Sequence, residues 1–126
     1  MLKRAAVVFG IAFIAAGILG FVPGITTSDG YLLGIFHVNA AHNVIHLVSG
    51  AAALYAGMQS ESLSRLYFQV FGVIYALVAL LGLFYGREPL LGFIAHNPAD
   101  VVLHLVIAAA ALYFGFGYRE HRPITA

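Results

Sequence analysis

The chain has 126 residues, of which 62% are hydrophobic and only 9% are charged, and its mean hydropathy is +0.95. Soluble domains carry about 25% charged residues, so this composition excludes an ordinary soluble protein and predicts a membrane protein. The absence of cysteine excludes disulfides, iron–sulfur clusters and thiolate metal sites. A formal net charge of +1 gives no reason to expect a nucleic-acid partner. We therefore expect a single small domain, residues 1–126, in a lipid bilayer.

Four apolar stretches predict four transmembrane helices. About 18 or more apolar residues are enough to cross a hydrocarbon core about 30 Å thick, and we expect helices at about residues 3–22, 40–58, 63–86 and 98–117. Pro23-Gly24 ends the first helix. Asn39 is a good N-cap for the second. Asn97-Pro98 starts the fourth, because the missing N–H of proline costs nothing at the first helical position.

The sequence also contains an internal repeat. An offset of 58 residues pairs the second expected helix with the fourth: Asn39 with Asn97, His42 with Asp100, and His46 with His104. The first and third helices match at an offset of 62 residues, which pairs Gly10 with Gly72 and Gly20 with Gly82. We predict an all-α integral membrane four-helix bundle built from a duplicated transmembrane hairpin. Both copies insert in the same direction, so the pseudo-two-fold axis should run along the membrane normal.

Basic residues set the expected orientation. One arginine, Arg87, falls on one side of the bilayer, and the other basic residues fall on the opposite side: Lys3, Arg4, Arg65, Arg119 and Arg122. Since cytoplasmic loops are rich in lysine and arginine, we expect cytoplasmic N- and C-termini in a bacterial inner membrane. Small-residue stripes on the first and third helices leave room for a homodimer, although packing within one bundle explains them equally well.

Three histidines and one aspartate are the candidate site. His42 and His46, like Asp100 and His104, are four residues apart and lie on one face of a helix. Ionisable residues in membranes face the protein interior, and the small residues on these faces predict that the second and fourth helices touch closely. The four side chains would then meet near the outer face. Four nitrogen and oxygen ligands suit Zn²⁺, Fe²⁺, Mn²⁺, Ni²⁺ or Cu²⁺.

Other polar residues have weaker assignments. Asn43 and Tyr75 are candidates to hydrogen-bond and orient the metal ligands. His37 and His96, in the outer loops, would line an entrance, add a ligand or simply be solvated. His121 belongs to the cytoplasmic tail and is unrelated to the site. No nucleophile–base arrangement emerges, so no residue is assigned to catalysis.

Two alternatives remain open at this point. One is a haem b-binding electron-transfer module with His46 and His104 as axial ligands, although closely packed helices would leave little width for a macrocycle. The other is a purely structural or partner-binding bundle, in which Asp100 is only a helix-capping residue and the histidines hydrogen-bond between helices.

The first half resembles small four-pass bacterial membrane proteins catalogued only as a domain of unknown function. The resemblance is carried by the pattern Gly-x-Phe, Asn, His-Asn-x-x-His, Gly, which falls here on Gly34, Phe36, Asn39, His42, Asn43, His46 and Gly50. The second half matches more loosely through Asn97, Asp100 and His104. The resemblance implies the four-pass fold and singles out the same polar residues, but it implies no activity.

Overall fold

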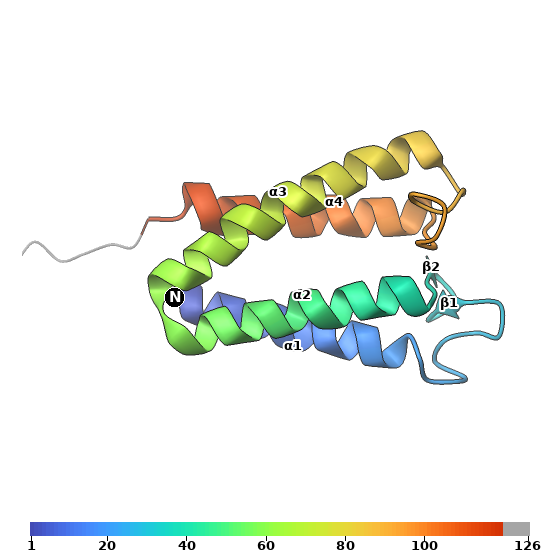
Figure 1. Cartoon of the computed structure of the whole chain (residues 1–126), viewed down its shortest axis with the longest axis horizontal. Helices are drawn as coiled ribbons and strands as arrows, with labels where there is room; N and C mark the ends of the chain where they lie inside the picture. The colour runs from blue at the N-terminus through green and yellow to red at the C-terminus, as the bar shows by residue number, and fades with distance from the viewer. Residues whose placement is uncertain (120–126) are drawn as a thin grey trace, which may run out of the picture.

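The computed structural model describes residues 1–119, and the tail residues His121 and Arg122 lie outside this range. The expected all-α class is confirmed, with the addition of a two-stranded antiparallel hairpin of two residues per strand. The described elements are α1 (Leu2–Leu19), β1 (Tyr31–Leu32), β2 (Phe36–His37), α2 (Ala40–Gln59), α3 (Glu61–Tyr85), α4 (Pro98–Leu112) and the π-helical turn η1 (Tyr113–Gly117). Figure 1 shows α1 beside α2 and α3 beside α4, with both longer loops at the same end.

Side-chain caps begin the three later helices. The Asn39 side chain accepts a hydrogen bond from the backbone N–H of His42 at 3.0 Å, and Asn97 accepts one from Asp100 at 3.0 Å. Ser60 caps α3 in the same way. Each cap satisfies one of the backbone donors that a helix start leaves without an intrahelical partner. The starts of α2 and α4 are therefore set by local sequence, as expected.

The first helix ends earlier than its apolar stretch predicts, and the fourth changes geometry before it reaches the predicted end at Gly117. The α-helical part of α1 ends at Leu19, where the hydroxyl of Thr26 donates to the Leu19 carbonyl at 2.9 Å. The α-helical part of α4 ends at Leu112 and continues as η1. The guanidinium of Arg65 donates to three carbonyls in and just after this turn, those of Phe114, Gly115 and Tyr118. Because these carbonyls have a partner on α3, the last turn can widen from α to π geometry.

Glycines bring the helices together within each hairpin. A Cβ atom on Gly10 of α1 would lie 2.9 Å from the carbonyl oxygen of Gly50 on α2, and one on Gly50 would lie 2.8 Å from the Gly10 oxygen. Gly72 of α3 is similarly close to the backbone of Leu112 on α4. Close backbone approach through small residues is the usual way in which membrane helices pack.

The expectation that α2 and α4 touch closely is wrong. Direct contacts between them are sparse, and the dominant pairings are α1 with α2 and α3 with α4. The glycines of α2 face α1 instead, while rings from α1 and α3 fill the centre of the bundle. Phe13 of α1 stacks on Tyr75 of α3 with ring centroids 5.4 Å apart. Aromatic bulk therefore lies where the sequence predicted a tight small-residue contact.

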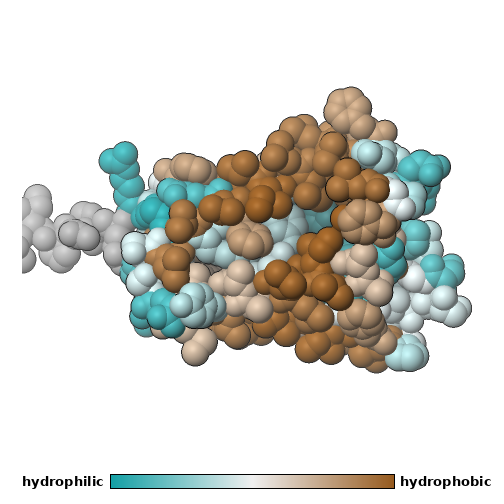
Figure 2. Space-filling model, viewed as in Figure 1, coloured by the Kyte–Doolittle hydropathy of each residue, from teal (hydrophilic) through white to brown (hydrophobic). Residues whose placement is uncertain are grey.

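The outer surface of the helices is apolar. Large apolar side chains such as Phe84, 88% exposed, cover the outward faces, and Figure 2 shows broad hydrophobic bands over the helices with hydrophilic residues gathered at the two ends. Among the described residues, three helices are long and apolar enough to cross a membrane: α1, α3, and α4 together with η1. α2 has 20 residues, but its buried polar side chains lower its hydropathy.

Candidate metal centre

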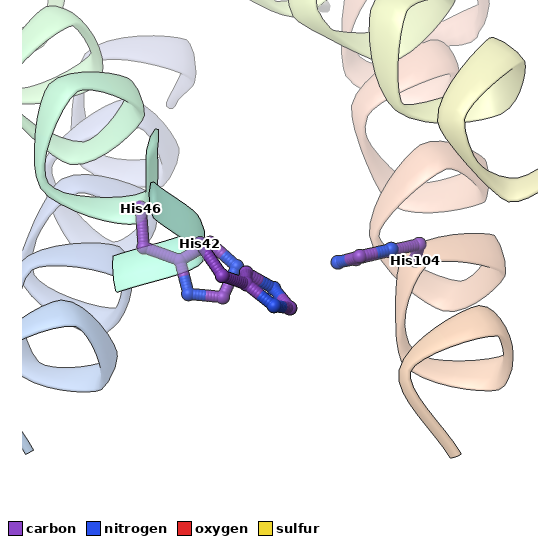
Figure 3. Close-up of side chains that lie close together, drawn as sticks. All are labelled: His42, His46 and His104. Carbon is purple, nitrogen blue, oxygen red and sulfur yellow. The ribbon is translucent and has the colours of Figure 1, made fainter. Parts of the chain in front are cut away.

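Three histidines from two helices converge inside the bundle. His42 and His46 come from the first two turns of α2, and His104 comes from α4. Each offers one ring nitrogen, and these three atoms all lie within 4.8 Å of one another. The side chains are only 2%, 4% and 4% exposed. Figure 3 shows His42 and His46 pointing from α2 across the space between the hairpins toward His104. Together they form the three-histidine cluster.

The protein backbone orients the His42 ring. Its Nδ1 atom lies 2.7 Å from the carbonyl oxygen of Ala95, in the loop before α4. A carbonyl can only accept a hydrogen bond, so Nδ1 must carry the proton and Nε2 must hold a lone pair. This Nε2 atom is buried and has no hydrogen-bond partner among the described residues. A carbonyl behind a histidine is the usual arrangement for a metal ligand, because it fixes the tautomer and the ring orientation.

The other two rings are also left with unpartnered nitrogens. Both ring nitrogens of His46 and the Nε2 atom of His104 are buried without a partner in the described residues. His46 packs against Phe13, with ring centroids 5.6 Å apart, and His104 packs against Tyr75 at 5.5 Å. A buried polar atom without a hydrogen bond costs about 1–3 kcal/mol. An ion bound between the three rings would remove this cost for each nitrogen that faces it.

Asp100 is not part of this cluster, contrary to the expectation of a four-ligand set. Its Oδ2 atom accepts hydrogen bonds from the backbone N–H groups of Asn97 and His37, both at 3.0 Å. Asp100 is the third residue of α4, where a carboxylate reaches back to the N-terminal side of its own helix and closes a capping box. The carboxylate is therefore engaged with backbone donors, and three histidines remain.

The two residues expected to support the ligands lie in different surroundings. The Tyr75 ring contacts His104, and its hydroxyl donates to the Ser49 hydroxyl at 3.0 Å. Tyr75 therefore borders the cluster and is held by α2. The Asn43 side chain instead lies against Gly20, the residue that follows α1, where a Cβ atom would collide with its amide. Asn43 serves the α1–α2 contact in this structure.

The loop histidines differ from each other. The His37 ring stacks on Tyr31 at 4.7 Å, outside the cluster. His96 is only 1% exposed, and both of its ring nitrogens lack a partner among the described residues, so the solvated reading of His96 is wrong. Its ring lies against Gly82 of α3, 3.6 Å from the place that a Cβ atom would take there. No pattern in the sequence predicts this contact.

The loop between α1 and α2 and the loop between α3 and α4 contact each other through equivalent hydrogen bonds. The Asn39 amide donates to the carbonyl of Phe93, and the Asn97 amide donates to the carbonyl of Ile35, both at 2.9 Å. The offset of 58 residues that relates Asn39 to Asn97 also relates Ile35 to Phe93. The same offset relates the bond between His42 and Ala95 to the bond between Asp100 and His37. Each loop also contains a leucine in the left-handed backbone conformation: Leu33 with φ of 55° and Leu91 with φ of 54°.

The family model described as Domain of unknown function (DUF4383) matches residues 3–117. The chain belongs to this family. The resemblance seen in the sequence is thereby confirmed, and the match includes all three histidines of the cluster. No curated protein and no solved structure matches the chain.

Proposed function

We propose that this protein is a four-pass inner-membrane protein that binds one divalent transition metal ion through His42, His46 and His104. The observation that carries the proposal is the convergence of three buried imidazoles, each with one ring nitrogen within 4.8 Å of the others. Each ring also has at least one nitrogen without a partner among the described residues. Histidines inside a membrane bundle are costly and usually functional. A metal ion would give a partner to every one of these nitrogens that faces the cluster.

The ligand set favours particular ions. Three neutral imidazoles without a thiolate suit Zn²⁺, Fe²⁺, Mn²⁺, Ni²⁺ or Cu²⁺. Zinc–nitrogen bonds of about 2.0–2.1 Å place tetrahedral ligand atoms about 3.3 Å apart, so modest ring rotations would close the cluster around an ion. Three protein ligands also leave one coordination position open, as in metal sites that bind a further small ligand.

A haem is less well supported than a bare ion. Although α2 and α4 are not in tight contact, the region between His46 and His104 holds the His42 ring, whose centroid is 4.5 Å from that of His46 and 5.7 Å from that of His104. The ring of Phe13 on α1 packs against His46, and the ring of Tyr75 on α3 packs against His104. A macrocycle between His46 and His104 would have to displace these rings.

The four-pass, duplicated-hairpin topology is part of the proposal. α2 runs the length of α1 (Figure 1), so a bilayer crossed by α1 would also be crossed by α2. The equivalent loop bonds of Asn39 and Asn97 support a pseudo-two-fold axis along the membrane normal. The distribution of basic residues then gives cytoplasmic termini and places the three-histidine cluster near the outer face.

Metal analysis of detergent-purified protein, prepared without chelators, tests the proposal. We expect close to one metal ion per chain in the wild type, and loss of that metal in His46→Ala and in His104→Ala. His37→Ala is the matched control, because its ring stacks on Tyr31 outside the cluster. Metal that is absent even after loading, or that survives His46→Ala, would refute the proposal. A Soret band that depends on His46 and His104 would establish the haem alternative instead.

A further inference from the structure

An apolar groove leads from the outer surface of the helices to the three-histidine cluster. It lies between α2 and α3, has a volume of about 310 Å³, and all three histidines border it. α2 and α3 diverge from their short connection toward the loop end (Figure 1). The face they form is hollowed between two hydrophobic banks (Figure 2). Ligand sites typically combine apolar walls of this kind with a few convergent polar groups.

The groove opens on the apolar outer surface of the helices. Its walls include the exposed side chains Val48 of α2 and Ile74 of α3, and its outer end is bordered by Leu91 of the loop. These residues belong to the same apolar surface that would face the hydrocarbon core of a membrane. A molecule that reaches the histidines by this route must itself be soluble in the bilayer.

Charge decides what the head group of that molecule should be. A divalent ion held by three neutral imidazoles keeps its full charge of +2 in a medium of low dielectric constant, where an unbalanced charge is costly. The only buried carboxylate among the described residues is Asp100, and its Oδ2 atom already binds two backbone N–H groups. The open coordination position therefore favours an anionic oxygen ligand.

We propose that the metal-loaded cluster binds a free fatty acid from the bilayer, with the carboxylate on the metal and the acyl chain in the groove between α2 and α3. This inference rests on the proposed metal site. It adds the class of ligand, an anionic single-chain amphiphile, and the lateral route by which the ligand arrives. The carboxylate supplies the negative charge that the three imidazoles lack, and the apolar walls exclude small water-soluble anions.

Cobalt substitution tests the inference in the full-length protein. Co²⁺ bound by imidazoles absorbs in the visible range, and a change of its fourth ligand alters that spectrum. We expect oleate in a non-ionic detergent to change the spectrum of the Co²⁺ protein. Acetate at the same concentration, which has the head group without the chain, should not. Oleyl alcohol, which has the chain without the charge, should not either.

Paired variants locate the acyl chain. Val78 lines the groove on α3, and Val78→Phe should raise the half-saturating oleate concentration about tenfold while the Co²⁺ spectrum without oleate is retained. Val73→Phe is the matched control: the same change on the same helix, at an exposed residue that does not line the groove. Retained Co²⁺ absorption also shows that each variant is folded.

The outcomes separate the two proposals. A protein that takes up no Co²⁺ refutes the metal site and this inference with it. Co²⁺ binding without any response to oleate refutes the fatty acid alone. An equal response to acetate contradicts the role of the groove, and an equal response to oleyl alcohol contradicts the carboxylate. Equal weakening by Val78→Phe and Val73→Phe contradicts the placement of the chain.

Discussion

The Nδ1 atom of His42 lies 2.7 Å from the carbonyl oxygen of Ala95, across the interface between the two helical hairpins. This one bond joins α2 to the loop that precedes α4 and leaves the Nε2 atom of His42, which holds the lone pair, without a hydrogen-bond partner among the described residues. The geometry of the candidate metal centre thus depends on how the two hairpins dock.

This bond makes a direct prediction about the metal-free protein. We expect ¹⁵N NMR of histidine-labelled protein to show His42 as the neutral tautomer with the proton on Nδ1, because the carbonyl accepts only from a protonated nitrogen. His42→Gln assigns the resonance by removing it. A His42 ring that carries its proton on Nε2 would contradict the bond, and with it the assignment of Nε2 as the nitrogen available to a metal.

Substitution of Asp100 distinguishes a capping residue from a metal ligand. Asp100→Ala should leave the metal content unchanged, because the carboxylate binds the backbone of Asn97 and His37 and not an ion. It should lower the free energy of unfolding by about 0.5–2 kcal/mol, as expected for loss of a helix cap.

Metal analysis and thermal unfolding of the same preparation measure both effects of Asp100→Ala. Loss of the metal at unchanged stability would instead restore the four-ligand set that the sequence suggested.

The loop amides test the proposed internal symmetry. Asn39→Ser and Asn97→Ser each keep a good N-cap but remove the amide that reaches the opposite loop. Each substitution should lower the free energy of unfolding by about 1 kcal/mol, the usual net value of a hydrogen bond. The two decreases should be similar. Unfolding in mixed detergent measures them. A large loss of stability from one substitution and none from the other would contradict equivalent docking of the two loops.

Labelling of engineered cysteines tests whether α2 crosses the membrane. The natural chain has no cysteine, so Ser28→Cys and Ser62→Cys each provide a single label. Both serines are exposed, one in the loop between α1 and α2 and the other at the start of α3. In intact cells, an impermeant thiol reagent should reach Cys at position 28 and reach position 62 only after permeabilisation.

Equal labelling at positions 28 and 62 would mean that α2 does not cross, and the four-pass topology would fail. Labelling at position 62 alone would keep four passes but reverse the orientation inferred from the basic residues.

Local features of the site could be predicted from the sequence. Asn39 and Asn97 act as caps because the cap depends on only a few neighbouring residues. The helical spacing of four residues put His42 and His46 on one face, and the repeat put His104 opposite them. These inferences need only the period of a helix and the rule that ionisable residues face inward.

Contacts between residues far apart in the chain could not be predicted from the sequence. A glycine stripe predicts that some helix comes close but not which one, and Gly50 packs on Gly10 of α1 instead of on α4. The spacing of Asp100 is compatible with a metal ligand and with a capping residue. Only the backbone N–H of His37, which donates to its carboxylate, shows that it binds the backbone. The burial of His96 likewise depends on how its loop folds against α3.

X-ray absorption at the metal edge of the loaded protein tests the central claim most directly. We predict three imidazole nitrogens at about 2.0–2.1 Å if the ion is Zn²⁺, together with one further light-atom ligand. His104→Ala should abolish this three-imidazole signal, because the variant is expected to lose the metal, whereas His37→Ala should leave the spectrum unchanged. A ligand shell made only of oxygen atoms, or one that His104→Ala does not alter, would contradict a metal centre built from His42, His46 and His104.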